Sequence, residues 1–445
     1  MAKTYESYKD SGSTWIGQIP SGWELGNFRY YGEFTKGKLP SSTNVEAKGL
    51  PIIGASEMLG KECRTFTEET NVPLCKPDDI LILWDGANAG IISSHHTGVV
   101  SSTAVKYSCL NPDVNKNYLF YLLKSVEPFF KEEVNGTTIP HMNMKYINEV
   151  PLLIPSSKEQ QSIASFLDTK CGEIDSLISL QEEMISELQA YKQSVITEAV
   201  TKGLDPNAKM NCCASREKND ACISSSETQP AIERKFKDSG VEWIGEIPEK
   251  WSKDKVFRVF ANIGSGTTPK ATEDSNFEGE INWIQSGDIN GSIMNSCKNK
   301  ISQQVLNKYS ALKIYKAPFI IVAMYGASVG NISVSMIDGC VNQACCVMSD
   351  SVHYFDYLFY AIKSAKDYLI YRAEGGGQPN ISQDKLKNLW LPIPPLSEQQ
   401  AIASYLDVKT SQIDSLISLK QQKIDELKSY KKSIIYEYVT GKKRV

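Results

Sequence analysis

Two short polar loops carry side chains that are suited to hydrogen bonding with another molecule. Residues 136–143 read GTTIPHMN, and residues 375–382 read GGGQPNIS. Carboxamide side chains both donate and accept, and they can form paired hydrogen bonds with the edge of an adenine base. Capping and turn formation explain the same side chains equally well. The candidate contact residues in these loops are Thr138, His141, Asn143, Gln378, Asn380 and Ser382.

Two glycine-bracketed segments and several lysines are candidates for contact with an anion. Residues 86–90 (GANAG) and 326–330 (GASVG) follow strand-like runs. They lack the lysine and the following helix of a phosphate loop, so we interpret them as tight turns between strands, with backbone approach to a phosphate as the alternative. A solvated surface of mixed charge explains isolated lysines equally well. The candidate residues are Lys36, Lys38, Asn88, Lys270 and Ser328.

The charge balance restricts how the chain could bind nucleic acid. It has 48 basic and 52 acidic residues, a net charge of -4 and a pI near 5.8. Most stand-alone DNA binders are basic. Either the positive field is local, or a partner supplies much of the contact with phosphate.

The chain repeats its own sequence at two places. Residues 8–23 match 236–251 at 10 of 16 positions with an offset of 228, and residues 159–201 match 398–440 at 26 of 43 with an offset of 239. The middle of the second copy is therefore 11 residues longer. A period above 200 residues is too long for a solenoid or propeller and indicates a duplicated domain.

The second repeated segment has the apolar spacing of a coiled-coil helix, with steps of 3, 4 and 7 residues. Each helix is expected to run about 40 residues, or about 60 Å. We predict that the two helices pair with each other in antiparallel orientation; the alternative is that each packs only on its own domain. The predicted seam residues are Ile174, Leu177, Ile178, Ile185, Leu188, Tyr191 and Val195, matched by Ile413, Leu416, Ile417, Ile424, Leu427, Tyr430 and Ile434.

These features predict an α+β fold, with two globular mixed α/β domains separated by two long helices that pair as an antiparallel coiled coil with pseudo-two-fold symmetry. Strand-like runs at 78–84, 98–110, 317–325 and 341–348 belong to the variable middles. The predicted segments are a first domain (1–157), a first helical region (158–201), a flexible polar linker (202–235), a second domain (236–396) and a second helical region (397–445).

The remaining composition predicts a cytoplasmic protein. No run approaches the roughly 18 to 20 apolar residues of a membrane span, and the first ten residues lack a signal-peptide core. The 11 cysteines include no Cys-x-x-Cys, and the four histidines do not complete a zinc site. We expect reduced thiols and no bound metal.

The motifs together resemble one known family along essentially the whole chain. KDSG-x-x-WIG-x-IP-x-x-W opens each half, G-x-x-x-PNIS precedes a strand, and LPIPPLSEQQ-x-IA-x-x-LD opens a long helix. This pattern is similar to the specificity subunit of type I restriction-modification systems. The first copy departs from it, because its loop reads TTIPHMN and its helix lacks the preceding Pro-Pro pair. The family pattern therefore indicates less about which residues of the first domain contact its half-site.

The resemblance implies a division of labour. Each globular domain would be a target-recognition domain that reads one half of a bipartite site in double-stranded DNA, and the helices would fix the spacing. Two modification subunits would dock on the helices and methylate adenine with S-adenosylmethionine, and restriction subunits would use ATP and Mg for translocation and cleavage. The chain itself would bind no cofactor. The candidate docking or helix-packing residues are Gln160, Ile163, Leu167, Gln399, Ile402 and Leu406.

We find no catalytic segment in the sequence. An adenine methyltransferase needs Asn/Asp-Pro-Pro-aromatic to hold the flipped base, whereas Asn111-Pro112 is followed by Asp113 and Asp205-Pro206 by Asn207. We therefore expect a non-catalytic recognition subunit. Two alternatives remain at this point: a coiled-coil adaptor that binds only proteins, and a remnant of a fused methyltransferase-nuclease.

Overall fold

The structure is a computed structural model. It describes residues 4–13, 15–134, 140–204, 234–270, 277–326, 328–373 and 380–445. The chain divides into two compact units. Unit 1 consists of Met1–Met184 and Leu419–Val445, and unit 2 consists of Ile185–Ser418. Most of the predicted linker lies outside the described residues.

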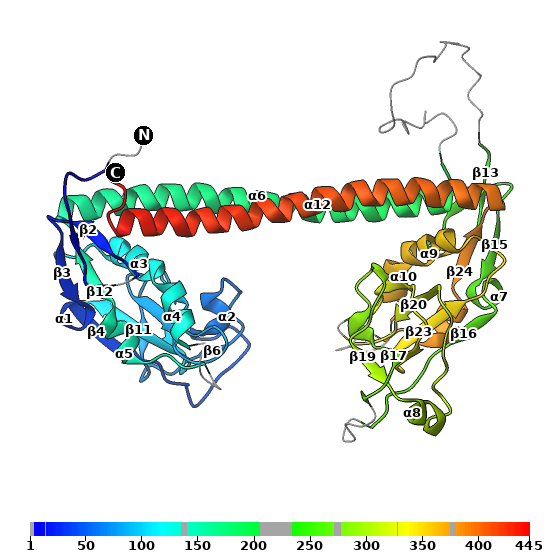
Figure 1. The fold of residues 1–445 in the computed structure, drawn as a ribbon, viewed down its shortest axis with the longest axis horizontal. Helices are drawn as coiled ribbons and strands as arrows, with labels where there is room; N and C mark the ends of the chain where they lie inside the picture. The colour runs from blue at the N-terminus through cyan, green and yellow to red at the C-terminus, as the bar shows by residue number, and fades with distance from the viewer. Residues whose placement is uncertain are drawn as a thin grey trace, which may run out of the picture. The chain divides into compact units, whose positions relative to one another are not determined.

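The described residues of unit 1 contain four small sheets, the N-terminal part of one long helix and the C-terminal part of another; Figure 1 shows their arrangement. Its strands are β1 (Tyr8–Asp10), β2 (Gln18–Pro20), β3 (Glu24–Asn27), β4 (Gly32–Lys36), β5 (Leu50–Ile53), β6 (Phe66–Thr67), β7 (Leu74–Cys75), β8 (Ile80–Leu83), β9 (Ile92–Ser93), β10 (Gly98–Val100), β11 (Ala104–Cys109) and β12 (Pro151–Ile154). Its helices are α1 (Phe28–Tyr31), α2 (Ala55–Met58), α3 (Lys116–Ser125), α4 (Glu127–Val134), α5 (Met144–Glu149) and the start of α6 (Ser157–Lys202).

The central sheet of unit 1 is antiparallel, with strand order β4-β11-β8-β9. Successive side chains of a strand point to opposite faces, and β8 is apolar throughout because both of its faces are covered. Ile80 and Ile82 belong to the main core with α3, whereas Leu81 and Leu83 pack towards the mixed sheet β6-β5-β10-β7. The two parts of the run 98–110 form separate strands in these two sheets.

Unit 2 repeats this plan with its own strands. They are β13 (Phe236–Asp238), β14 (Glu246–Pro248), β15 (Ser252–Lys255), β16 (Asn262–Gly264), β17 (Ile281–Ile284), β18 (Ile293–Met294), β19 (Asn299–Ile301), β20 (Phe319–Ala323), β21 (Ile332–Ser335), β22 (Cys340–Val341), β23 (Cys345–Ser349) and β24 (Trp390–Ile393). Its helices are α7 (Val256–Val259), the 3-10 turn η2 (Ser286–Asp288), α8 (Gln303–Lys308), α9 (Phe355–Ser364), α10 (Lys366–Tyr371), α11 (Gln383–Lys387) and the start of α12 (Leu396–Val439).

The central sheet of unit 2 has strand order β16-β23-β20-β21-β18, beside a small sheet of order β19-β17-β22. Strand β20 is buried on both faces, as β8 is in unit 1. Ile320 and Val322 pack with α9, and Ile321 packs with Ile284 and Val341 of the smaller sheet. The predicted strand-like runs therefore correspond to real strands in both units.

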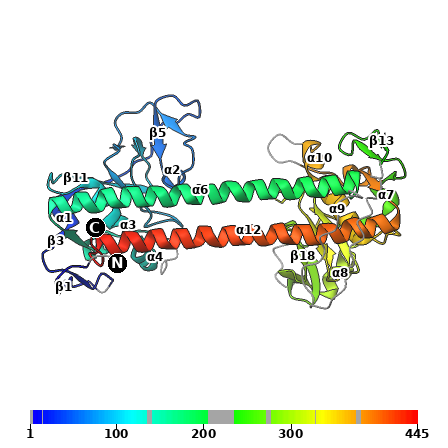
Figure 2. The ribbon, with the colours of Figure 1, turned by 90° about the horizontal axis from the view of Figure 1, so that it is seen from above.

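The long helices α6 and α12 contain 46 and 44 residues and lie side by side (Figures 1 and 2). In unit 1, the Lys431 ammonium lies 2.6 Å from the Asp175 carboxylate, and the Phe166 and Tyr438 rings are 4.4 Å apart. Residue numbers fall along one helix as they rise along the other, so the pairing is antiparallel as predicted. In unit 2, Lys192 makes the matching ion pair with Asp414 at 2.6 Å.

Each unit is completed by the C-terminal part of the helix that starts in the other repeat. In unit 1, Ile434, Ile435 and Val439 of α12 belong to the main core together with Ile163 and Leu167 of α6. In unit 2, residues 195–200 of α6 contribute four side chains to the core around the start of α12. The alternative that each helix packs only on its own domain is therefore wrong.

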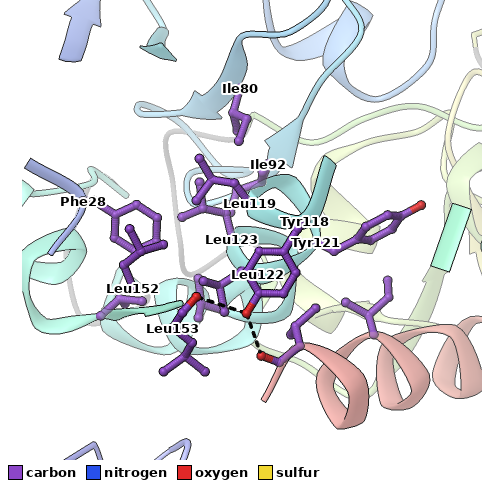
Figure 3. Packing of buried hydrophobic residues seen from close by; sticks show 14 of the residues in the cluster. Phe28, Ile80, Ile92, Tyr118, Leu119, Tyr121, Leu122, Leu123, Leu152 and Leu153 are labelled. Atoms are coloured by element: carbon purple, nitrogen blue, oxygen red, sulfur yellow. Dashed lines mark hydrogen bonds between the residues drawn. The ribbon is translucent and has the colours of Figure 1, made fainter. Parts of the chain in front are cut away.

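A buried tyrosine marks this junction in each unit. Tyr118 of α3 directs its hydroxyl towards the carbonyl oxygens of Leu153 and Val439, at 3.1 and 3.4 Å (Figure 3). In unit 2, Tyr357 of α9 faces the carbonyl oxygens of Pro392 and Val200 at 2.9 and 3.4 Å. Burial raises the pKa of both phenols, so they remain neutral donors.

Four of the predicted seam residues lie outside the helix seam. Leu177 and Leu416 are each 47% exposed, and Tyr191 and Tyr430 are 56% and 57% exposed. Ile174 and the matched Ile413 of α12 are only 5% and 4% exposed. The prediction was wrong at these four positions, because the apolar spacing covers a wider arc of each helix than the partner helix and the globular domain can bury.

Candidate nucleic-acid interface

In unit 1, two loops that are far apart in the sequence meet at the end of the central sheet. Asp85 follows β8, and it forms an isolated antiparallel bridge with His141. Lys36 lies beside them because β4 and β8 both pair with β11. The buried ring of Trp84 packs against the side chains of Lys36 and His141. We call Lys36, Trp84, Asp85 and His141 the unit 1 edge.

The side chains of the unit 1 edge form a charged hydrogen-bonded group. Lys36 donates to one carboxylate oxygen of Asp85 at 2.7 Å, and His141 Nδ1 hydrogen-bonds with the other. The ammonium of Lys36 lies 5.7 Å from the centre of the Trp84 ring. Burial opposes ionisation of Asp85, but the hydrogen bonds from Lys36 and His141 outweigh it and lower the pKa of this carboxyl. Asp85 is therefore a carboxylate at neutral pH.

This group can contact a base edge without refolding, because its charged side chains are held in place and remain accessible. The exposed side-chain fractions of Lys36, Asp85 and His141 are 45%, 36% and 58%. A carboxylate accepts from the amino group of cytosine, and a lysine donates to the acceptors of guanine. The Asp85 carboxylate alone cannot bind a phosphate, so the arrangement favours base reading over contact with the backbone.

Unit 2 has the same backbone arrangement with different side chains. Tyr325 and Asn380 form the matching isolated bridge, and the amide of Ile381 donates to the carbonyl oxygen of Met324 at 2.7 Å. The Tyr325 hydroxyl donates to the main chain at Gln343, whose side-chain oxygen accepts from Thr268. Burial raises the pKa of Tyr325, so the phenol stays neutral. The unit 2 edge (Tyr325, Asn380, Gln343 and Thr268) is uncharged.

The glycine-bracketed segments are tight turns between antiparallel strands, as interpreted from the sequence. One joins β8 to β9, and the other joins β20 to β21. Gly86 and Gly90 have φ of 96° and 88°, and Gly326 and Gly330 have φ of 85° and 76°. Side chains rarely adopt this left-handed backbone, which is why glycine occupies the turn ends. The turns place the bridge residues of each edge beside the loop before α5 or α11.

Four predicted contact residues of unit 1 are exposed at or next to its edge: Lys36, Lys38, Asn88 and His141. Asn143 is exposed but also caps α5, where its side-chain oxygen accepts from the amide of Lys145 at 2.9 Å. Thr138 lies outside the described residues. The structure thus gathers most of the unit 1 candidates, although their contacts with DNA remain predictions.

The unit 2 candidates are more dispersed. Asn380 is exposed in the unit 2 edge, and Ser382 caps α11 two residues later. Ser328 is half-buried in the β20–β21 turn, and Lys270 is exposed on the loop after β16. Gln378 lies outside the described residues.

The six candidate docking or helix-packing residues are buried within their own units. Gln160 and Gln399 are each 1% exposed, and the four apolar residues are 0–1% exposed: Ile163, Leu167, Ile402 and Leu406. Gln160 accepts from the amide of Asn115 at 2.8 Å and donates to the carbonyl of Pro155 at 3.0 Å. The structure therefore gives these residues packing roles.

Sequence reasoning missed the residues that complete each edge. Trp84 ends the strand-like run 78–84 and Asp85 follows it, and Gln343 lies within the strand-like run 341–348; none of the three was singled out as a contact residue. The signal at Trp84 and Asp85 is a polar or aromatic residue directly after a buried strand and before a glycine turn. Tyr325 has this signal as well, at the matched place in the second copy.

Neither a metal centre nor a membrane span is found among the described residues. No group of three or more His, Cys, Asp or Glu residues in that part of the chain could hold a metal ion. None of the described helices is long and apolar enough to cross a membrane. The cysteines that the structure describes are free thiols.

Comparison with known proteins connects both units to one family. A family model described as the type I restriction modification DNA specificity domain matches residues 20–190 and 248–429. The type I restriction enzyme MjaVIII specificity subunit of Methanocaldococcus jannaschii is 28% identical over 444 residues, covering 96% of this chain and 94% of that protein. The EcoBI specificity subunit of Escherichia coli is 22% identical over 386 residues, covering 84% and 76%.

A solved structure concerned with complex assembly and conformational transition of the type I R-M system contains a chain of the same fold. Its TM-score is 0.63 at 15% identity, covering 95% of this chain and 98% of that chain. This chain belongs to the family of type I restriction modification DNA specificity domains. Its role is to provide DNA sequence specificity.

Proposed function

We propose that this chain is the specificity subunit of a type I restriction-modification complex in which each recognition domain reads one half of a bipartite site in double-stranded DNA. The first recognition domain is residues 1–157 and the second is residues 236–396. One observation carries this proposal: the two units share a backbone framework, yet their edges hold a charged group in one case and an uncharged group in the other. A shared framework with different side chains suits two different half-sites.

The long helices have two roles in this proposal. They fix the spacer between the half-sites, and they dock two modification subunits. Because the matched glutamines and the apolar residues near them are buried, docking requires other residues. The exposed leucines at matched positions are suitable: Leu177 and Leu180 on α6, and Leu416 and Leu419 on α12, are 47–60% exposed. On each helix the two leucines are three residues apart and share one face, and contiguous exposed apolar side chains are typical of interaction surfaces.

The chain contributes recognition rather than chemistry in this proposal. Its sequence lacks a methyltransferase base-holding segment and a phosphate loop. S-adenosylmethionine, ATP and Mg would be bound by the modification and restriction subunits, in the cytoplasm where the DNA is accessible. Purified chain without partners is expected to transfer no methyl group to DNA. Methyl transfer by this chain alone would contradict the proposal.

The test is to map N6-methyladenine across the genome in cells that express the cognate modification subunit with or without this chain. We expect a split motif that appears only when the chain is present. The docking surface is tested in the same cells with Leu177→Lys and Leu416→Lys together, which should abolish both co-purification and methylation. Absence of any chain-dependent motif, when both proteins are present and co-purify, would refute the specificity role.

A further inference from the structure

One surface of unit 2 combines cations with two aromatic rings where β15, α7 and α11 meet. We call its cations the basic track: Lys253, Lys255, Arg258, Lys385 and Lys387. Two carboxylates, Asp254 and Asp384, lie on the same elements, so positive charge is in excess. Exposed Phe257 and half-buried Trp390 separate the cations.

Three cations of the basic track lie over these rings. The ammonium groups of Lys253 and Lys255 lie 5.0 and 5.3 Å from the centre of the Trp390 ring. The guanidinium of Arg258 lies 5.4 Å from the Phe257 ring, and its side chain is 60% exposed. Lys253 and Lys385 also donate to the main-chain carbonyls of Ser239 and Arg372, so their ammonium groups are further restrained. The side chains therefore lose less conformational freedom when they bind an anion.

The basic track continues directly from the unit 2 edge. Helix α11 begins after Asn380 and Ser382, and at its other end Lys255 donates to the side-chain oxygen of Asn388 at 3.0 Å. The five residues of α11 span about 8 Å. Duplex DNA advances 3.4 Å along its axis for each phosphate of one strand. DNA bound at the edge can therefore place two further phosphates along α11 and another beside α7.

The matched elements of unit 1 carry fewer cations: Arg29 of α1, which lies 4.6 Å from the centre of the Tyr30 ring, and Lys145 of α5. Strand β3 and helix α1 match β15 and α7 at an offset of 228, and the element before the long helix matches at 239. The three most informative matched pairs, each with the unit 2 residue first, are Lys255 and Asn27, Arg258 and Tyr30, and Lys387 and Asn148. Each pair replaces a cation with an uncharged side chain.

We propose that the basic track binds the DNA phosphate backbone that flanks the half-site read by unit 2, so that the second recognition domain supplies more sequence-independent grip than the first. The inference rests on the proposed function, because the DNA must be seated at the unit 2 edge. It also explains how a chain with a net charge of -4 holds DNA, since the basic track provides a local excess of positive charge. An acidic segment of a partner protein is the competing occupant, but only DNA explains why the track begins at the edge.

The test compares the salt dependence of DNA binding by the full chain in complex with its modification subunits. The variant is Lys255→Gln, Arg258→Gln and Lys387→Gln together. The matched control changes three exposed lysines of unit 1 in the same way: Lys9→Gln, Lys61→Gln and Lys131→Gln. A fluorescein-labelled 40-base-pair duplex carrying the split motif is titrated by anisotropy from about 50 to 200 mM KCl, a range over which phosphate contacts dominate the change.

Loss of three phosphate contacts should lower the slope of log K against log salt by about 2.7, or about 0.9 for each contact. The affinity advantage of the unmodified chain should therefore shrink about 40-fold across this salt range. The control should keep the original slope. Methylated motifs in cells should keep both half-site sequences in the variant, which separates this inference from the proposed function.

Three outcomes would overturn the inference. The first is an unchanged slope in a variant whose unfolding temperature and circular dichroism match those of the unmodified chain. The second is an equal loss of slope in the unit 1 control. The third is an unchanged slope with loss of co-purification, which would identify an acidic partner protein as the occupant. If no split motif depends on this chain at all, the proposed function fails independently of the slope.

Discussion

Gln160 provides the clearest test of whether the repeated glutamines stabilise the fold or dock partners. Its side-chain oxygen accepts from the amide of Asn115 at 2.8 Å, and its amide donates to the carbonyls of Pro155 and Asp113 at 3.0 and 3.3 Å. It thus joins the start of α3 and the end of β12 to α6. We consider Gln160→Leu, which leaves an apolar side chain one atom shorter and removes all three hydrogen bonds.

The expected cost follows from the groups that lose their partners. A buried backbone group without a partner costs about 1 to 3 kcal/mol. Two such groups, the Asn115 amide and the Pro155 carbonyl, are left by this change, and Pro155 is buried. Since Asn115 is only half-buried, we expect a loss of about 3 kcal/mol for unit 1. For a unit of about 200 residues, this corresponds to a decrease of about 6 to 12 °C in Tm.

Calorimetry and hydrogen exchange resolved by peptide mass would measure this loss. Faster exchange should be confined to unit 1, including α3, whereas unit 2 keeps its own intact Gln399 contacts. The control is Gln161→Leu, the same change at the adjacent exposed position, which should alter Tm by no more than about 2 °C. If Gln160→Leu left stability unchanged and abolished only binding of the modification subunits, the packing role would be refuted.

Three further predictions follow from individual residues. Burial lowers the pKa of Lys363 to about 8; because the unfolded chain binds an extra proton between pH 8 and 10.5, the free energy of unfolding should rise with pH across that window by up to about 3 kcal/mol. Lys366→Glu should reduce this rise, measured by urea denaturation at several pH values. The new carboxylate would pair with the Lys363 ammonium as Glu127 pairs with Lys124 at 2.6 Å. Asp85→Asn should change the base preference within one half-site of the methylated motif by about 10- to 100-fold, measured by sequencing, and should leave the other half-site sequence unchanged. Seven residues inserted at matched positions of both α6 and α12 lengthen each by about 10 Å, so the methylated spacer should widen by about 3 base pairs; an unchanged spacer would exclude the ruler role.

Much of the framework could be predicted because it depends on local sequence. The two long helices were expected from apolar spacing, and their antiparallel pairing from the repeat. The strands β8 and β20 were visible as apolar runs next to glycine turns. The composition of each edge could not be predicted in this way, because it depends on contacts between residues that are far apart in the sequence. Lys36, Asp85 and His141 come from three separate segments, and no local pattern indicates that they meet.

Helix periodicity also could not separate buried from exposed apolar residues. Ile174 and Leu177 are one turn apart and equally apolar, yet the first is 5% exposed and the second 47%. The difference arises because α6 contacts both α12 and the globular part of unit 1 along an arc that excludes Leu177. A single sequence gives the width of an apolar stripe, whereas the contact arc depends on what packs against it.

The matched hydrogen bonds show why the edges can vary while the fold does not. Trp23 and Trp251 donate to Glu159 and Glu398 at 3.2 and 3.0 Å, so the same indole–carboxylate contact closes the start of each long helix. These polar contacts lie next to the helices, whereas each edge lies on loops beyond the central sheet. Replacing an exposed edge residue such as Asp85 therefore removes no contact that holds the helices. New half-site specificity can arise at the edges without a large loss of stability, because surface substitutions away from packed networks usually change the free energy of unfolding by no more than about 0.5 kcal/mol.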